Sequence, residues 1–217
     1  MVQKRLFQGP DHTAAWLGLL GFGPMSEPQI PPTSPIDAAQ IQAETQFWLE
    51  KAVIGLNLCP FAKSVHVNQR MRYVVSMADT PEALLKELAH ELMALMRADP
   101  DEIETTLLIH PLVLDDFLDF NDFLGAADAL VEELKLEGDL QIASFHPDYQ
   151  FAGTALDDIS NFSNRSPYPT LHLLRETSIE RATETMADTD SIFETNIETL
   201  EKLGLEGWSA LGLKTRR

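Results

Sequence analysis

The spacing of apolar residues in the first half of the chain predicts a helix, a strand and a second helix. In residues 37–57 the apolar side chains recur at helical spacing, and Asp37 stands where an N-cap would accept the first free amides. Residues 70–77 alternate between apolar and polar side chains, which is typical of a strand. Residues 80–98 open with Thr-Pro, a favoured helix start, and carry a stripe of leucines.

Three further strands are expected in the second half. Residues 104–109 and 140–145 are short apolar runs, and each is followed directly by His-Pro, at His110 and His146. A polar loop separates the second run from residues 170–175, where apolar and polar residues alternate again. Ligands of open α/β sheets bind beyond the carboxyl ends of the strands, so the two histidines mark that edge as a candidate site.

Helices are expected between and after these strands. Asp115 and Asp116 open one with an apolar stripe, which we expect Gly138 to end. Ser and Asp open the last two expected helices, at about 178–187 and 190–203. This order predicts an α/β or α+β fold, a single domain with a mixed four-stranded sheet flanked by helices.

The ends of the chain differ from this core in composition. Residues 1–36 repeat Gly and Pro without a sustained apolar period, so we interpret them as a disordered or loosely ordered leader. Within it, Met25 opens a stretch that resembles a natural protein start, and we interpret residues 1–24 as an upstream extension without a functional role. The predicted domain covers residues 37–205, and residues 206–217 form a predicted C-terminal tail.

Charge and cysteine content narrow the classes of partner. The chain has 16 Lys and Arg against 34 Asp and Glu, a net charge of -18 at pH 7, which disfavours nucleic acids and anionic membranes as partners. No apolar run approaches the ~20 residues of a membrane-spanning helix. The single cysteine excludes an intrachain disulfide and fits a reducing compartment, so we expect a cytoplasmic protein with a small-molecule ligand.

The segment between residues 140 and 176 holds most of the candidate chemistry. It combines His, Arg, Asn and Pro between two expected strands, and polar loops anchored in this way commonly carry binding and catalytic groups. Asp148 and Tyr149 follow His146 closely and are placed to orient its ring. Trp48 and Phe151 are expected in the core or in a pocket wall.

Cys59 has three open interpretations: a nucleophile, a metal ligand or a small core residue. It lies where a proline should end the first helix, with Lys63 one turn further on. To react at neutral pH its thiol needs a neighbouring base or cation, which His146 or His110 would supply if the sheet brings them together.

A metal site is a second open interpretation. His110, His146 and His172, together with Cys59, form a candidate ligand set that suits zinc or iron as a divalent cofactor. No short ligand motif such as CxxC or HxH supports this set, so every ligand would have to come from a separate element.

The arginines of the polar segment indicate an anionic ligand. Arg165 and Arg175 stand out in an acidic chain, and guanidinium groups grip carboxylate or phosphate with two hydrogen bonds. The alternative for Arg165 is an internal clamp, in which it pairs with Asp157 or Asp158 and holds the loop in shape. The expected substrate-binding residues are Lys63, Tyr149, Asn164, Arg165 and Arg175.

Four stretches of the chain resemble a known protein family. NLCPFAK (57–63), ASFHPDYQFAG (143–153), NRSPYP (164–169) and LHLLRE (171–176) are similar, in this order, to the bacterial family named domain of unknown function 1415. The resemblance covers about residues 43–182. The family name assigns no activity, so the resemblance implies no catalytic role for any residue, and it leaves the leader and the final helix outside as peripheral parts.

Two functions are compatible with these residues. The first is an enzyme that acts on a small anionic metabolite, with His146 as general base or metal ligand and Cys59 as nucleophile or ligand. Asp148 would orient His146, and Arg165 with Arg175 would hold the anionic group. The second is a non-catalytic ligand-binding or accessory protein that uses the same pocket.

Overall fold

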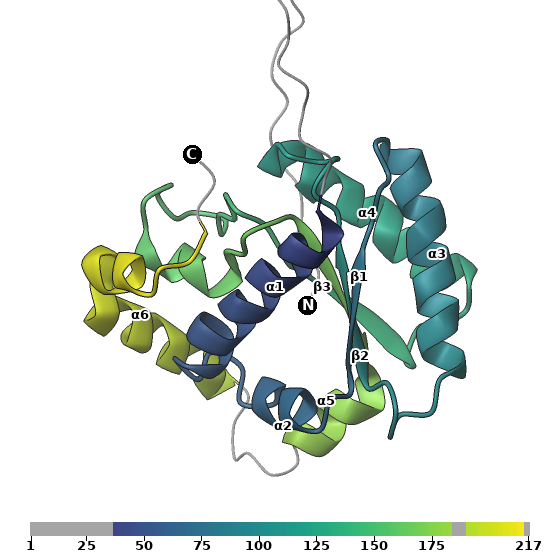
Figure 1. Ribbon diagram of the computed structural model, residues 1–217, viewed down its shortest axis with the longest axis horizontal. Coiled ribbons are helices and arrows are strands. Elements are labelled where there is room, and N and C mark those ends of the chain that lie inside the picture. The colour runs from purple at the N-terminus through teal and green to yellow at the C-terminus, as the bar shows by residue number, and fades with distance from the viewer. Residues whose placement is uncertain (1–36, 184–189, 215–217) are drawn as a thin grey trace, which may run out of the picture. The chain divides into compact units, whose positions relative to one another are not determined.

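Four strands form one mixed sheet in the computed structural model, which describes residues 37–183 and 190–214. The strands are β1 (Met71–Val75), β2 (Thr105–Ile109), β3 (Leu140–Phe145) and β4 (Thr170–Arg175), in the order β1-β2-β4-β3. β1 and β2 pair in parallel, whereas β4 runs antiparallel to both β2 and β3. The expected mixed sheet flanked by helices is confirmed, and Figure 1 shows helices on both of its faces.

Parts of the sequence-based interpretation fall outside the described residues. The expected leader, residues 1–36, and the upstream extension within it lie there, as do residues 215–217 of the expected tail. In the described ranges, no helix is both long enough and apolar enough to cross a bilayer.

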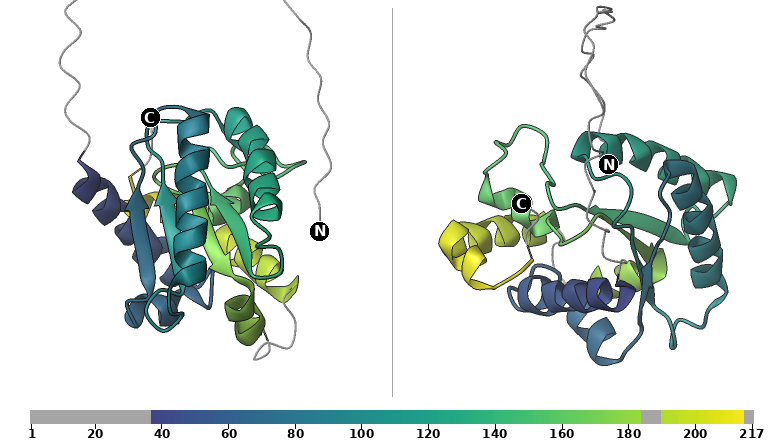
Figure 2. Two further views of the ribbon diagram at one scale, coloured as in Figure 1. Left: turned by 90° about the vertical axis from the view of Figure 1, so that its right-hand side faces the viewer. Right: turned by 45° about the horizontal axis from the view of Figure 1, so that its top comes forward.

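Two helices cover the same face of the sheet because both parallel crossovers have the same hand. α3 (Pro81–Arg97) connects β1 to β2, and α4 (Phe117–Glu133) connects β2 to β3 past the inserted β4. Right-handed crossovers that step in one direction along a sheet put their helices on one side, and Figure 2 shows α3 and α4 side by side there. Thr80 caps α3 and Asp116 caps α4, which agrees with the helix starts expected at Thr80-Pro81 and at Asp115 and Asp116.

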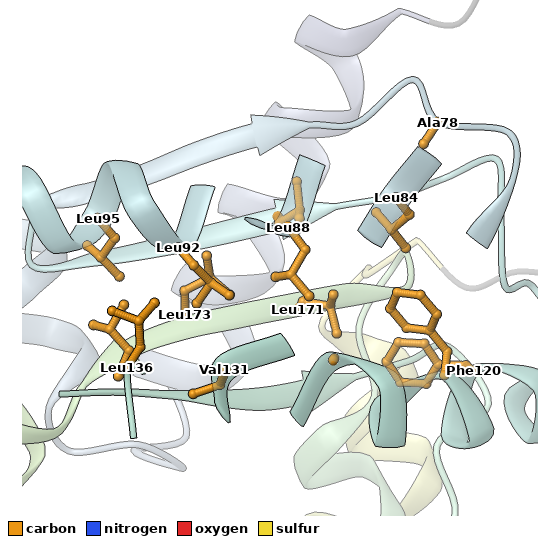
Figure 3. Close-up of a cluster of buried hydrophobic side chains, with 14 of the residues drawn as sticks. Ala78, Leu84, Leu88, Leu92, Leu95, Phe120, Val131, Leu136, Leu171 and Leu173 are labelled. Atoms are coloured by element: carbon orange, nitrogen blue, oxygen red, sulfur yellow. The ribbon is translucent and has the colours of Figure 1, made fainter. Parts of the chain in front are cut away.

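The first hydrophobic core lies between this helix pair and the sheet. Leu84, Leu88 and Leu92 of α3 belong to one cluster with Leu171 and Leu173 of β4 (Figure 3), and all five are 0% exposed. Leucines spaced four residues apart on the helix therefore pack against leucines spaced two residues apart on the strand. Because each fully buried leucine contributes about 1.5–3 kcal/mol, this contact holds β4 at the centre of the sheet.

The opposite face carries a second core. α1 (Ala38–Trp48), capped by Asp37, lies there and continues as the π-helical η1 (Leu49–Ile54). α6 (Asp190–Ala210) packs beside them (Figure 1), and its Leu200 and Trp208 join Trp48, Leu49 and Ala52 in one buried cluster. The remaining helices are α2 (Ala62–Val67), the 3-10 helix η2 (Ile159–Asn164), which packs on α6, and α5 (Glu176–Thr183).

Most expected elements are confirmed, with differences at their ends. The strands expected at 140–145 and 170–175 match β3 and β4 from end to end. The short α2 and η2 were missed because six residues are too few to show a helical period. The stop expected at Gly138 is wrong, since α4 ends at Glu133 and Lys135 takes the left-handed turn with φ of 57°.

The part of the chain after β4 is more ordered than a tail. α5 begins at Glu176 rather than at Ser178, and α6 continues past residue 203 to Ala210 across a break at Gly204. Trp208 is only 6% exposed. Residues 206–214 are therefore part of the folded structure, although the sequence presents them as a tail.

Arg175 fastens the end of β4 to the end of α3. Its Nη2 donates hydrogen bonds to the carbonyl oxygens of Leu95 at 2.6 Å, Ala98 at 2.8 Å and Ile103 at 3.2 Å. The residue is 7% exposed, and burial lowers the pKa of its guanidinium group. Its cation thus donates to backbone oxygens at the end of α3 and at Ile103, shortly before β2.

We expect Arg175→Leu to lower the free energy of unfolding by about 2–4 kcal/mol, because buried carbonyl oxygens lose a charged donor. The measurement is urea denaturation followed by circular dichroism. Arg181→Leu on α5 is the matched control, since Arg181 bonds to Thr177 and Ser178 but is exposed. Equal losses in the two variants would contradict this role of Arg175.

Candidate functional site

Three stretches of backbone meet at the edge of the sheet where β2 and β3 end. His110 follows β2 and His146 follows β3, and because β4 is antiparallel its first residue pairs with the last residues of both strands. The backbone N–H of His110 donates to the carbonyl of Pro169 at 3.0 Å, and that of His146 donates to Asn164 at 3.1 Å. The expected meeting of both histidines at one edge is confirmed. The polar loop of residues 146–169, which we call the β3–β4 loop, begins and ends at this edge.

His146 is an anchor between this loop and α4. Its Nδ1 accepts the backbone N–H of Asp148 at 3.0 Å, so its proton is on Nε2, which donates to the carbonyl of Leu114 at 3.2 Å. The ring lies 5.4 Å from that of Phe117 and 5.1 Å from that of Phe120, and the residue is 0% exposed. Burial lowers its pKa, which keeps the imidazole neutral. Both nitrogens are occupied, so neither is free to take a proton from a substrate.

His110 packs on Phe120 as His146 does, but one of its ring nitrogens has no hydrogen-bond partner among the described residues. Its Nδ1 donates to the carbonyl of Val113 at 3.0 Å, while its buried Nε2 has no partner among the described residues. The ring stacks on Phe120 with centroids 5.6 Å apart. Burial lowers the pKa of His110 to about 4, so the imidazole is neutral at neutral pH.

Cys59 and His172 lie on the other side of the sheet from these two rings. Cys59 packs against the second core, and burial raises the pKa of its thiol more than the amides of Phe61 and Ala62 lower it. His172 alternates with buried residues of the first core and therefore faces the second. Its Nε2 is 2.6 Å from Oγ1 of Thr105, a contact in the middle of the sheet.

The four proposed metal ligands do not converge. Among residues 37–183 and 190–214, no group of three or more His, Cys, Asp or Glu side chains is placed to hold a metal ion. Strand alternation turns His172 away from the face of His110 and His146. Cys59 lies between η1 and α2, which pack on the second core. The same separation keeps His110 and His146, the two proposed bases, on the opposite face of the sheet from Cys59.

Arg165 is a clamp of the loop, but its partners are not the expected carboxylates. Its Nε donates to the carbonyl of Tyr149 at 3.2 Å and its Nη2 donates to that of Leu156 at 2.6 Å. Its guanidinium carbon lies 4.2 Å from the centre of the Phe162 ring. No carboxylate in the described part of the chain forms an ion pair with it, so neither Asp157 nor Asp158 does. Burial lowers the pKa of this half-buried cation, and Asp148 opposes the shift from a distance.

Asn161 gives the loop its shape and was not predicted as a site residue. It is 0% exposed, and its Oδ1 accepts hydrogen bonds from the N–H of Phe151 at 2.9 Å and the hydroxyl of Thr154 at 2.8 Å. Its Nδ2 donates to Ala155 at 2.8 Å. A polar residue between apolar Ile159 and Phe162 was the available signal in the sequence, because a buried amide must be satisfied in this way.

The other predicted binding residues are dispersed. Asn164 donates from Nδ2 to the carbonyl of Ser144 at 3.2 Å, and Tyr149 packs on Phe117. Lys63 is exposed on α2, which leads into the amino end of β1. Arg175 lies at the amino ends of β2 and β3, so it is at the opposite edge of the sheet from Arg165 and cannot share an anion with it.

A pocket of about 190 Å³ opens beside Arg165 on the side of the second core. Of the predicted site residues, Arg165 and Asp148 line this pocket. Trp48, which was expected in the core or in a pocket wall, lines it as well. The remaining contributors come from η2, from the loop prolines and from the end of α6. We call it the Arg165 pocket, and the residues that matter below are Trp48, Asp148, Phe162, Arg165, Trp208 and Lys214.

Lys214 reaches this pocket from far along the chain. Its Nζ lies 2.8 Å from Oε2 of Glu44 and 2.7 Å from the hydroxyl of Tyr168, and that hydroxyl also donates to Glu44. Burial alone would raise the pKa of Glu44, but hydrogen bonds from Lys214 and Tyr168 outweigh it and lower the pKa. The same bonds raise the pKa of Lys214. The three side chains therefore form one charged, hydrogen-bonded triad.

We expect His146→Ala to lower the free energy of unfolding by about 2–4 kcal/mol, because it removes two buried hydrogen bonds and the packing on Phe117 and Phe120. His90→Ala on the exposed side of α3 should change it by less than about 0.5 kcal/mol. Chemical denaturation at pH 7 compares the two variants. A fully stable His146→Ala protein would instead support a functional imidazole.

Stability should fall as the pH drops from about 6.5 towards 4, the window set by the pKa of His110. The folded pKa of about 4 lies below the ordinary value of 6.5, so the unfolded chain binds more protons in this window. His110→Asn keeps a donor for Val113 without titrating, and should reduce the slope by up to about 1.4 kcal/mol per pH unit. Urea denaturation between pH 5 and 7 measures the slope, and His90→Asn is the control. An unchanged slope in His110→Asn would refute the assignment.

Comparison with known proteins identifies the family. Residues 40–210 match the family described as "Protein of unknown function (DUF1415)". This range extends past the motif resemblance at residues 43–182 and includes all of α6, so the final helix is part of the family fold and is not peripheral. No curated protein and no solved structure matches the chain. The chain therefore belongs to the DUF1415 family.

Proposed function

We propose that this protein binds a small organic anion in the Arg165 pocket, without chemical turnover. The observation that carries the proposal is a half-buried guanidinium group with no carboxylate partner among the described residues, in a chain of net charge -18. A cation that is partly desolvated and unpaired is stabilised when a carboxylate or phosphate group binds beside it. The clamp bonds of Arg165 hold its fork in place before any ligand arrives.

The walls of the pocket favour a ligand with a flat apolar body. Trp48, Phe162 and Trp208 line it, and the indole of Trp208 meets the ring of Phe162 edge to face at 5.1 Å. Aromatic walls with few polar groups are typical of small-molecule sites. Lys214 is neutralised by Glu44, so Arg165 is the group that recognises the negative charge.

Binding is favoured over catalysis by the position of the reactive groups. Cys59 and His146, the proposed nucleophile and base, lie in different cores, and the nitrogens of His146 are both occupied. The hydroxyl of Ser166, which also lines the pocket, donates to the carbonyl of Tyr168 at 2.6 Å. Among the described residues that line the pocket there is no Cys and no Ser with a free hydroxyl, which supports the binding alternative.

The proposed cellular location and class of partner follow from the charge and the cysteine content of the chain. We retain the cytoplasm as the proposed location because the single cysteine suits a reducing compartment. Nucleic acids and anionic membranes remain unfavourable partners for a chain with 34 acidic and 16 basic residues. A small metabolite, whose anionic group would bind beside Arg165, is the proposed partner.

The test is a fluorescence titration with phenyl phosphate, which combines an anion with a flat ring, against neutral benzamide. Trp16→Phe leaves Trp48 and Trp208 as the emitters, and both line the pocket. We expect saturable changes with phenyl phosphate alone, and a dissociation constant at least about tenfold higher in Arg165→Gln. Arg97→Gln, an exposed arginine of α3, is the control for the change in net charge.

A second variant separates binding from loop folding, since Arg165 also clamps the loop. Asp148 is exposed and lines the pocket near Arg165. Asp148→Asn removes a repulsive charge and should tighten phenyl phosphate binding by about threefold. The proposal fails if wild-type protein shows no saturable change, or if neither variant shifts the dissociation constant.

A further inference from the structure

We propose that residues 204–214 form a lid on the Arg165 pocket, hinged at Gly204 and latched by Lys214. This inference rests on the proposed binding function. Trp208, Leu213 and Lys214 of this segment line the pocket together with Trp48 of α1 and Phe162 of η2. The segment therefore forms one wall, and the other walls belong to elements that the sheet holds in place.

Gly204 provides the hinge. It has φ of 65° and ψ of 174° inside α6, and these angles separate the last turns from the rest of the helix. A Cβ atom at this position would meet nothing within 4 Å, so the glycine is required by its backbone conformation and not by lack of space. Residues on the two sides of the break can thus change orientation through one pair of backbone angles.

Lys214 provides the latch. In the described part of the chain, the hydrogen bonds that tie residues 205–214 to another element are those from Lys214 to Glu44 and Tyr168. The backbone bonds from Leu211 to Trp208 and from Gly212 to Ser209 stay inside the segment and move with it. Both charged ends of the latch keep contact with solvent, 43% for Lys214 and 23% for Glu44, so opening the latch exposes no unpaired buried charge.

The aromatic walls show why a ligand needs the lid to move. Trp48 is 2% exposed and Trp208 is 6% exposed, although both line the pocket. Trp208 of this segment belongs to the same buried cluster as Trp48, so a ring packs flat on the indole of Trp48 only when the segment moves. Entry and exit of the ligand are therefore coupled to opening of this segment, which the latch opposes together with the apolar contacts of Trp208 in the second core.

The experiment uses Lys214→Met, which keeps the aliphatic length and removes the latch, in the full chain carrying Trp16→Phe. Lys202→Met is the matched control, because Lys202 forms an exposed pair with Glu198 on the same helix. Stopped-flow fluorescence with phenyl phosphate measures association and dissociation rate constants. Acrylamide quenching without ligand measures the accessibility of Trp48 and Trp208.

We expect Lys214→Met to raise both rate constants by about tenfold and to increase quenching, with no change in Lys202→Met. Loss of a positive charge by itself would slow the association of an anion, so faster association distinguishes a lid from simple electrostatics. Glu44→Gln opens the same latch while keeping Lys214 and should also raise both rates. Wild-type binding with unchanged or slower association in Lys214→Met would overturn the lid alone. Absence of binding in the wild type would overturn the proposed function and the lid with it.

Discussion

The antiparallel pairing of β4 between β2 and β3 is the constraint on which the rest of the structure depends. Two right-handed crossovers carry the chain from β1 to β2 and then to β3 and leave a gap one strand wide, which β4 fills. Because β4 must start at the edge where β3 ends, the β3–β4 loop has to leave and return at that edge. The loop, which contains η2, is thereby held close to α6, where the Arg165 pocket forms.

The histidines at this edge show how burial gives a structural role to a residue that looks catalytic in the sequence. A strand-end imidazole is useful in chemistry when water and substrate reach it, but α4 covers both rings through Phe117 and Phe120. In that setting a charged imidazole would be costly, so the neutral form is kept. Both nitrogens of His146 and Nδ1 of His110 bond to backbone groups. A histidine at the end of a strand indicates an active site in the sequence. In this structure the two such histidines pack in the core instead.

Backbone carbonyls, more than carboxylates, are the partners of the buried arginines. Arg175 bonds to the end of α3, and Arg165 bonds to two turns of the β3–β4 loop. Carbonyl oxygens accept hydrogen bonds from these guanidinium groups without neutralising the cation, which leaves positive charge in place. For Arg165, which lies in a pocket wall, this is the property that an anion site requires.

The sequence by itself determined the elements and their order, and tertiary structure decided what the candidate residues do. Helical and strand periods are local, so they predicted β3 and β4 to the residue, together with the cap at Asp37 and the helix starts near Thr80 and Asp116. They also predicted that both histidines lie at one edge of the sheet, because parallel strands end at the same edge. Which face each side chain takes, and what lies opposite, depends on contacts between distant positions. Glu44 and Lys214, 170 residues apart, meet only because α1 and the end of α6 flank one pocket, and no local pattern records such a meeting.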